Sequence, residues 1–191
     1  MHVDEAIRSR RTHKFFAGGA IDDATLRELV ELACWAPNHR FTEPWRFYAV
    51  RGAALPAMKQ ALVASLDAMA KDGDDESMRR LEQKRDKIAR RLDGTGAVVV
   101  VTWKRSPDDT AQDREDYAAT ACAVQNLLLG ATARGLCGLW STGAVLMTPS
   151  MRAFYGVGEG ETIAAVVFLG HPQTRLQGRR YKTEAEVLRF V

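Results

Sequence analysis

The sequence has few of the features that build disulfide-bonded, zinc-binding or membrane-spanning proteins. Its three cysteines are Cys34, Cys122 and Cys137, and no two of them have CxxC spacing. An odd number of cysteines without that spacing argues against a disulfide framework and a zinc site. All three stand among apolar residues, so we expect reduced thiols in the core of a cytoplasmic protein. The longest uninterrupted apolar run, residues 97–101, is far shorter than the roughly 20 residues that a membrane helix needs.

Several targeting and catalytic motifs are also missing. No apolar stretch follows a basic region at the start, so no signal peptide is expected. None of the four histidines lies in an HExxH motif, and neither GxSxG nor GxxxxGK[ST] occurs. These absences argue against a catalytic metal, a serine nucleophile elbow and a phosphate loop. The glycines of residues 156–160 follow a predicted helix and precede a predicted strand. A dinucleotide fingerprint has the opposite order, so they predict a turn.

The composition is that of an ordinary globular protein. Of the 191 residues, 46% are hydrophobic and 27% are charged, which argues against wholesale disorder. Lys plus Arg is 27 and Asp plus Glu is 24, so 27 − 24 gives a net charge of +3. That excess is too small to indicate a nucleic-acid partner. The length favours one domain over residues 1–191, with enough core to fold without disulfides or metals.

Apolar periodicity predicts helices and strands in mixed order, which indicates an α+β or α/β layered domain. The expected helices cover residues 3–11, 23–36, 55–71 and 112–134, with a short one opening at Thr148-Pro149. The expected strands cover residues 45–51, 97–102, 136–141 and 162–169. A polar tail follows over residues 171–191. Its apolar end, residues 187–191, can dock, for example as an added strand on a neighbouring chain.

The segment of residues 72–93 is dense in charges of both signs. We interpret it as an insertion that forms either a solvated helix face or a mobile loop. The alternative is a nucleic-acid-binding arm through the basic residues between Arg79 and Arg91. The interspersed acidic residues argue against that alternative because they would repel phosphates.

Three segments carry groups suited to ligand binding. Residues 8–15 combine arginines, a lysine and hydroxyls, which suit a phosphate or another oxygen-rich anion. Residues 36–47 form a loop between prolines that presents amide, imidazole and guanidinium groups. Residues 135–143 combine glycines, which let a flat ligand approach the backbone, with the aromatic side chain of Trp140. Each segment also has an ordinary structural interpretation, as a helix end, a tight loop and a core strand.

Four motifs occur in a fixed order along the chain. They are Arg10-Arg11-Thr12, Ala36-Pro37-Asn38-His39 leading to Pro44-Trp45-Arg46-Phe47, Gly135-Leu136 leading to Trp140 and Gly143, and Leu169-Gly170-His171-Pro172. Together they resemble the FMN-dependent nitroreductase family, in particular its compact members. The resemblance implies a mixed sheet flanked by helices, a single domain and an intertwined homodimer with FMN at the interface.

The resemblance also implies cofactor-binding residues. Arg10, Arg11 and Thr12 would contact the flavin phosphate, ribityl chain or pyrimidine edge. Lys14 would lie near flavin N1 and O2, where a cation stabilises the reduced flavin anion.

The remaining implied contacts come from later in the chain. Trp140, Ser141 and Thr142 would line the isoalloxazine or the ribityl chain. His39 would reach the partner's flavin, and Arg134-Gly135 would border the nicotinamide-binding entrance.

Some residues depart from the family pattern. Glu43 stands where glutamine is common, and a carboxylate cannot donate the amide's hydrogen bond. Trp35 would stack near FMN or pack against the helix, and the apolar helix face favours packing. Arg179 or Arg180 could reach the FMN phosphate, or the tail could be solvated.

The activity that the resemblance implies is hydride transfer from NADPH or NADH through FMN to an acceptor. A nitroaromatic, a quinone, an enone or another flavin could accept. The kinetics would be ping-pong, and no catalytic side chain is expected because the flavin supplies the chemistry. The alternative is a flavin-binding protein without turnover, for storage or sensing. Neither nucleic acid nor membrane is an expected partner.

Overall fold

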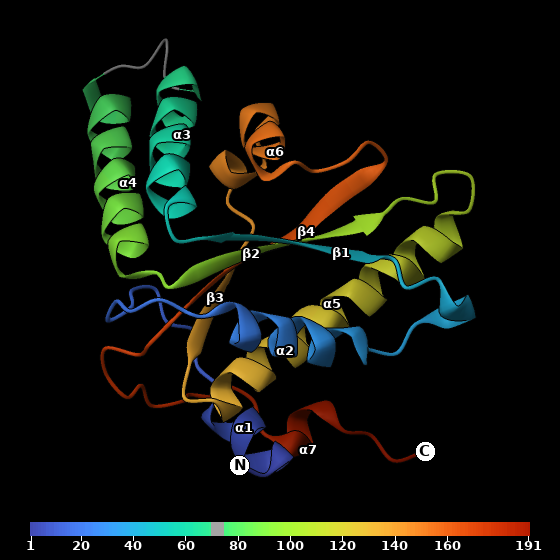
Figure 1. Cartoon of the computed structure of the whole chain (residues 1–191). Coiled ribbons are helices and arrows are strands. Elements are labelled where there is room, and N and C mark those ends of the chain that lie inside the picture. Colours follow the sequence, from blue (N-terminus) through green and yellow to red (C-terminus); the bar gives the residue numbers. More distant parts are fainter. Residues whose placement is uncertain (70–74) are drawn as a thin grey trace.

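A four-stranded sheet forms the centre of the computed structural model, which describes residues 1–69 and 75–191 (Figure 1). Its strands are β1 (Trp45–Arg51), β2 (Ala97–Lys104), β3 (Cys137–Ser141) and β4 (Glu161–Gly170). They stand in the order β1-β2-β4-β3, and each adjacent pair is antiparallel. The sequence predicted all four strands. A mixed sheet was expected, and in the described residues the parallel pairing consists of a single bridge between Thr12 and Gly138 beside β3.

The valine-rich run of β2 is buried on both faces of the sheet. Val98 and Val100 belong to one hydrophobic cluster, and Val99 and Val101 belong to the other. Because successive side chains of a strand point to opposite faces, a strand covered on both sides needs an unbroken apolar run. This is why β2 shows no polar alternation.

Helices cover both faces of the sheet (Figure 1). One face carries α2 (Asp23–Cys34) and α5 (Thr110–Ala133), with α1 (Val3–Ser9) against α5. The other face carries α3 (Ala54–Met69), α4 (Asp75–Gly94) and α6 (Pro149–Tyr155). The shorter elements are η1 (His39–Phe41), η2 (Ala144–Met147) and α7 (Glu184–Val187). Among the described residues, none of the helices has the length and apolar character needed to cross a bilayer. The α+β fold class is confirmed.

The helix ends follow local sequence signals. The side chain of Asp22 accepts a hydrogen bond from the Thr25 N–H at the start of α2. Thr148 caps α6, whose first residue is a proline, and Gly156 ends it in the left-handed conformation. Residues 156–160 therefore form the predicted turn between a helix and a strand.

The charged segment folds as α4, which packs beside α3. Most of its described charged side chains are exposed, whereas Leu81 and Leu92 are buried. Of the two expected arrangements, the helix with a solvated face is therefore the one present. The expected continuation of the preceding helix to Lys71 and the first charged residues, 72–74, lie outside the described residues.

The expectation for the cysteines was wrong for two of the three. Cys137 is buried, but Cys34 and Cys122 are exposed. Cys122 lies on α5, which carries small and apolar residues around its whole circumference, so the sequence does not show which side faces the core. Cys34 is the last residue of α2.

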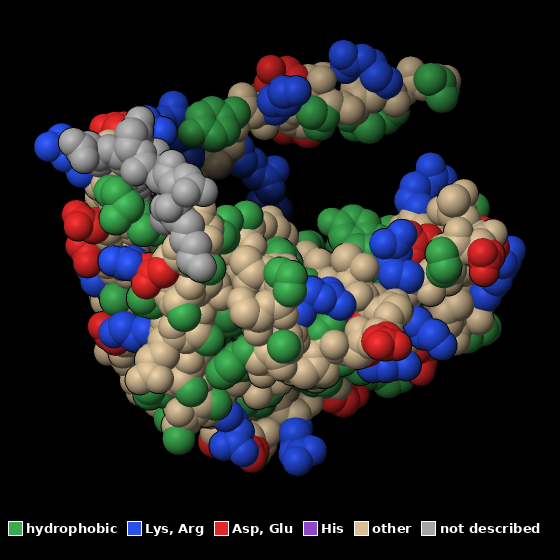
Figure 2. All heavy atoms as spheres, turned by 90° about the horizontal axis from the view of Figure 1, so that it is seen from above, with side chains coloured by type: hydrophobic (Ala, Val, Ile, Leu, Met, Phe, Trp, Pro, Cys, Tyr) green, Lys and Arg blue, Asp and Glu red, His purple; other side chains and the backbone are tan. Residues whose placement is uncertain are grey.

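The C-terminal segment contacts its own chain at its beginning, where the Gln173 side chain donates to the Phe16 carbonyl at 2.9 Å, but it does not join the core. Residues 171–191 are exposed throughout, and Phe190 is 91% exposed. Residues 184–187 form α7, and the last residues form no strand. Figure 2 shows a narrow arm that stands clear of the rest of the surface, with hydrophobic side chains at its tip, where the C-terminal residues lie in Figure 1. The predicted docking of this tail on a neighbouring chain stays a prediction.

Candidate functional site

Three segments far apart in the sequence converge beside the free edge of β3. The extended segment of residues 10–14 is fastened to β3 because the His13 N–H donates to the Gly138 carbonyl at 3.2 Å. The end of α4 joins them because Arg91 Nε donates to the Lys14 carbonyl at 3.2 Å. The structure therefore brings residues 10–14 and β3 together, and it adds a residue at the end of α4 that was not among those expected from the sequence.

That residue, Arg91, is half-buried and forms no ion pair with any carboxylate of the described chain. Its guanidinium lies 5.2 Å from the centre of the Phe168 ring. Burial lowers the pKa of Arg91, yet an arginine remains charged at neutral pH. Arg91 also lines a cavity of about 90 Å³ together with Ser141 and Gly143. A charged group without a carboxylate beside a small cavity is suited to an anionic ligand.

The sequence contains a signal for the half-buried position of Arg91. Ile88 and Leu92 lie on the face of α4 that turns toward the protein. Arg91 follows Ile88 by three residues, so it shares that face. Within a run of charged residues, this single position resembled the solvated arginines on either side.

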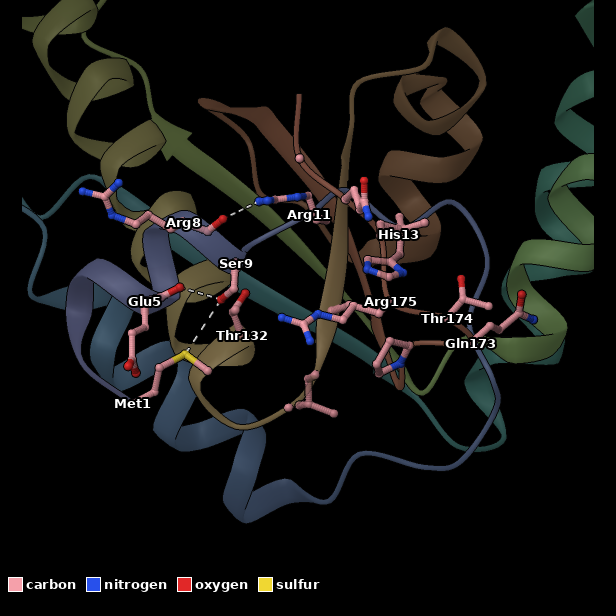
Figure 3. Close-up of a pocket in the computed structure, with 17 residues that line it drawn as sticks. Met1, Glu5, Arg8, Ser9, Arg11, His13, Thr132, Gln173, Thr174 and Arg175 are labelled. Atoms are coloured by element: carbon pink, nitrogen blue, oxygen red, sulfur yellow. Dashed lines mark hydrogen bonds between the residues drawn. The ribbon is translucent and has the colours of Figure 1, made fainter. Parts of the chain in front are cut away.

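The segment of residues 10–14 separates its side chains onto two sides. Arg11 and His13 line an open groove of about 1210 Å³ between α1, the end of α5 and residues 172–178 (Figure 3). Arg10, Thr12 and Lys14 do not line it. Alternate residues of an extended chain point to opposite sides, so Arg10, Thr12 and Lys14 form one set. Arg11, which was predicted to belong with them, points the other way.

The end of β3 separates its side chains in the same manner. Ser141 faces the cavity with Arg91, and Thr142 follows it on the surface. Trp140 packs against the core cluster on the α2 and α5 side, and its Nε1 donates to the Ala164 carbonyl at 3.3 Å. The indole therefore lies on the opposite face of the sheet from Ser141.

Two of the predicted residues lie far from this convergence. Trp35 directly follows α2 and His39 is the first residue of η1, and the segment from the end of α2 to η1 runs toward the other end of the sheet from residues 10–14 (Figure 1). Trp35 was expected to pack, but it is 77% exposed and donates to Glu31 at 2.6 Å. It follows Glu31 by four residues, which puts it on the polar face of α2.

The loop around His39 is held in a fixed shape by α5. His39 Nδ1 lies 2.5 Å from Glu115, and the Thr42 hydroxyl donates to the buried Asp116 at 2.7 Å. Within this loop Arg40, Phe41 and Glu43 have positive φ, a conformation that non-glycine residues rarely adopt. Side-chain contacts to α5 therefore stabilise a strained loop.

Arg134 and Gly135 end α5 beside the groove. Arg134 donates to Glu28 of α2 at 2.8 and 3.0 Å and to the Gly130 carbonyl at 3.2 Å. Gly135 has a φ of +73° and lines the groove. The ion pair with Glu28 occupies the Arg134 guanidinium within its own chain.

The sheet with helices on both faces, and the Arg91 guanidinium that has no carboxylate partner among the described residues, define an α+β protein with a surface site suited to an anionic ligand. The sequence profile of the Nitroreductase family matches residues 7–171. The chain belongs to this family.

Individual relatives agree with that assignment. YfhC of Bacillus subtilis, whose name places it among the NAD(P)H nitroreductases, is 30% identical over 88% of this chain and 83% of its own length. YdjA of Escherichia coli K12, which has the same kind of name, is 25% identical over 92% and 91%. The crystal structure of a nitroreductase-like family protein from Bacillus cereus superposes with a TM-score of 0.82 at 27% identity, over all of this chain and 96% of that one.

Proposed function

We propose that this protein is an FMN-dependent oxidoreductase that uses NADPH or NADH to reduce a small acceptor such as a nitroaromatic, a quinone or an enone. The observation that carries the proposal is the family match over residues 7–171. The names of relatives support the nicotinamide donor. A structural neighbour, NfnB of Mycobacterium smegmatis, is an FMN-dependent nitroreductase crystallised with NADPH, with a TM-score of 0.73 at 20% identity over 98% of this chain and 97% of that one.

The donor set at the edge of β3 fits a flavin. When bound, FMN supplies the hydride chemistry. In our proposal Lys14 and Arg91 face the pyrimidine end of the ring, where their positive charge stabilises the reduced anion. Arg10 binds the phosphate, because a guanidinium pairs with phosphate oxygens in a bidentate manner. The Thr12, Ser141 and Thr142 hydroxyls offer further hydrogen bonds.

The size of the cavity beside Arg91 supports a site shared between two chains. Its volume of about 90 Å³ equals roughly three water molecules, far less than a three-ring flavin. One chain therefore offers a single wall, and we propose that a homodimer supplies the other.

The exposed residues of the loop at η1 are candidates for that second wall. They include His39, Trp35 and Phe41, which is 92% exposed. The tail is a candidate for holding the dimer together. Charged residues and an apolar floor line an open groove of about 520 Å³ over α2 and the edge strand β1, and an added strand could occupy it.

Flavin content and flavin reduction together test the proposal. The purified protein should be yellow, release FMN on denaturation and lose its colour under anaerobic NADPH or NADH. A colourless protein that stays colourless after FMN is added would contradict any flavin function. Bound flavin that neither nucleotide reduces would favour the second candidate, a storage or sensing protein, which the carboxylate of Glu43 in place of an amide keeps open.

A further inference from the structure

Arg11 has an unusual role in the groove beside α1. Its Nη1 donates to the carbonyl of Arg8 at 2.7 Å (Figure 3) and to the carbonyl of Arg10, also at 2.7 Å. The Arg8 carbonyl lies in the last turn of α1, where carbonyls lack a partner within the helix. Hydrogen bonds from a charged donor are among the stronger ones. One guanidinium nitrogen therefore fixes two peptide groups, one on each side of residues 9 and 10.

Other hydrogen bonds hold the same stretch of backbone. The Arg10 N–H donates to the Ala6 carbonyl at 2.9 Å, and the His13 N–H donates to the Gly138 carbonyl at 3.2 Å. With both ends held, the Arg11 contacts determine how the backbone turns at Arg10. The direction of the Arg10 side chain follows from that backbone, because the Cα–Cβ bond is fixed by it.

Gly178 of the C-terminal segment lies against the same guanidinium. A Cβ at this position would stand 2.1 Å from Arg11 Nη2 and 2.4 Å from Cζ. Gly178 is not among the glycines with positive φ, so its backbone does not require glycine. Glycine is required there because the Arg11 guanidinium occupies the space that a side chain would need. Arg11 Nε is buried without a hydrogen-bond partner in the described chain, which shows how closely the neighbouring groups pack around it.

We propose that Arg11 is a positioning residue for Arg10 and that Gly178 keeps room for it. Arg11 does not touch the flavin; it orients Arg10 toward the phosphate from the opposite side of the segment. This proposal rests on the proposed function, in which Arg10 binds the FMN phosphate. It replaces the sequence-based expectation that Arg11 itself contacts the cofactor.

Affinities for FMN and for riboflavin, which lacks the phosphate, test this proposal. We expect Arg11→Ala to weaken FMN binding about tenfold, the size of one lost charged hydrogen bond, and to leave riboflavin binding unchanged. Arg10→Ala should do the same. Because Arg11 acts through Arg10, the double variant should bind FMN no more weakly than Arg10→Ala alone. Arg8→Ala is the matched control, since only its carbonyl takes part, and it should match the wild type.

Gly178→Ala provides an independent variant. A methyl group there would push the flexible guanidinium off the two carbonyls without displacing backbone, so FMN affinity should fall and the fold should survive. In an Arg11→Ala background the same substitution should have no effect.

Three results would overturn the positioning role while leaving the flavin function intact. They are unchanged FMN affinity in Arg11→Ala, an equal loss of riboflavin affinity, and additive losses in the Arg10 and Arg11 double variant. A wild-type protein that binds neither ligand would instead contradict the proposed function.

Discussion

At the scale of single residues, Arg91 differs from the other arginines of α4. Arg80 pairs with Glu76, and Arg85 pairs with Asp67. These ion pairs contribute little to the stability of the fold because solvent screens them. Arg91 is half-buried, stands over an aromatic ring and has no carboxylate partner in the described chain. Burying this charge costs desolvation free energy, and a bound anion would offset that cost.

The first prediction concerns the flavin potential. Arg91→Ala should lower the two-electron reduction potential of bound FMN by about 30 mV, equivalent to about 1.4 kcal/mol, because it removes a cation beside the reduced ring. Equilibration with a redox dye measures this shift. Arg90→Ala is the matched control, because Arg90 is exposed and lies over Phe15. Equal potentials in the wild type and Arg91→Ala would remove Arg91 from the site.

The second prediction uses the buried thiol. Burial raises the pKa of Cys137 from 9.0 to about 11. Between these values the unfolded chain loses the proton and the folded chain keeps it, so the free energy of unfolding falls as the pH rises from 9 to 11. The free energy of unfolding of the wild type should therefore fall by about 1–2 kcal/mol relative to that of Cys137→Ala across this range.

Urea unfolding at pH 8 and pH 10.5 measures that difference. Cys122→Ala, at an exposed cysteine, is the control and should show no narrowing. A gap that stays constant for Cys137→Ala would mean that its thiol titrates at its ordinary pKa in the folded protein.

At the scale of elements, the position of Arg91 depends on how the end of α4 meets the N-terminal segment. A Cβ at Gly94 would stand 2.2 Å from the Phe16 carbonyl oxygen. The Gly18 N–H also donates to the Gly94 carbonyl at 3.1 Å. The last residue of α4 therefore touches backbone directly, and this contact sets the depth at which the helix, and Arg91 with it, enters the site.

The third prediction follows from that contact. Gly94→Ala should lower the free energy of unfolding by about 2 kcal/mol, because overpacking against rigid backbone forces the helix outward. FMN affinity should fall with it as Arg91 moves. Gly143→Ala is the matched control for stability, since its Cβ would make only ordinary contacts at 3.8 and 3.9 Å and its φ is −60°. Thermal unfolding of both variants decides the matter, and equal midpoints would contradict the prediction.

At the scale of the whole molecule, the proposed site residues lie at two ends of the sheet. Residues 10–14 lie beside β3, and η1, which begins at His39, lies at the far end (Figure 1). A site that uses both sets needs two chains. Each chain would then complete the other's site, as in a symmetric dimer.

The fourth prediction is recovery of activity, at limiting FMN, on mixing two variants that each have a weakened flavin site. With Arg10→Ala and His39→Ala chains unfolded and refolded together, each mixed dimer would contain one site with neither substitution. At equal amounts about a quarter of all sites should therefore be intact. NADPH oxidation with a quinone measures the recovery, and each variant refolded alone is the control. No recovery, despite mixed dimers detected by mass spectrometry, would mean that both residues serve the same chain's site.

Much of the fold could be predicted because its signals are local. The valine run predicted β2, the apolar periodicity of residues 23–36 predicted α2, and Thr148-Pro149 predicted the start of α6. The predictions failed for the exposure of single side chains on helices, which depends on the side of the helix that faces the core. Trp35 looked apolar enough to pack, yet its register with Glu31 exposes it, and α5 carries apolar residues all round, which hid the exposure of Cys122.

The candidate site was less accessible to sequence reasoning than the fold. The family motifs selected Arg10 and Arg11 together because they are adjacent, although an extended backbone points them to opposite sides. Trp140 and Ser141 separate for the same reason. Arg91 was not predicted because its two partners are distant in the sequence: Lys14 lies 77 residues earlier, and Phe168 lies on β4.

By itself, the sequence determined the elements, the family and the group of segments that could bind an anionic cofactor, because hydrophobic periodicity, caps and motifs act over a few residues. The tertiary structure decided which of those side chains share a face. In the folded chain, Arg11 donates hydrogen bonds to the backbone of residues 8 and 10. Arg91 of α4 contacts the Lys14 backbone and shares a cavity with Ser141, whereas His39 lies at the opposite end of the sheet. These are long-range outcomes, set by strand pairing and helix packing between residues that no local pattern connects.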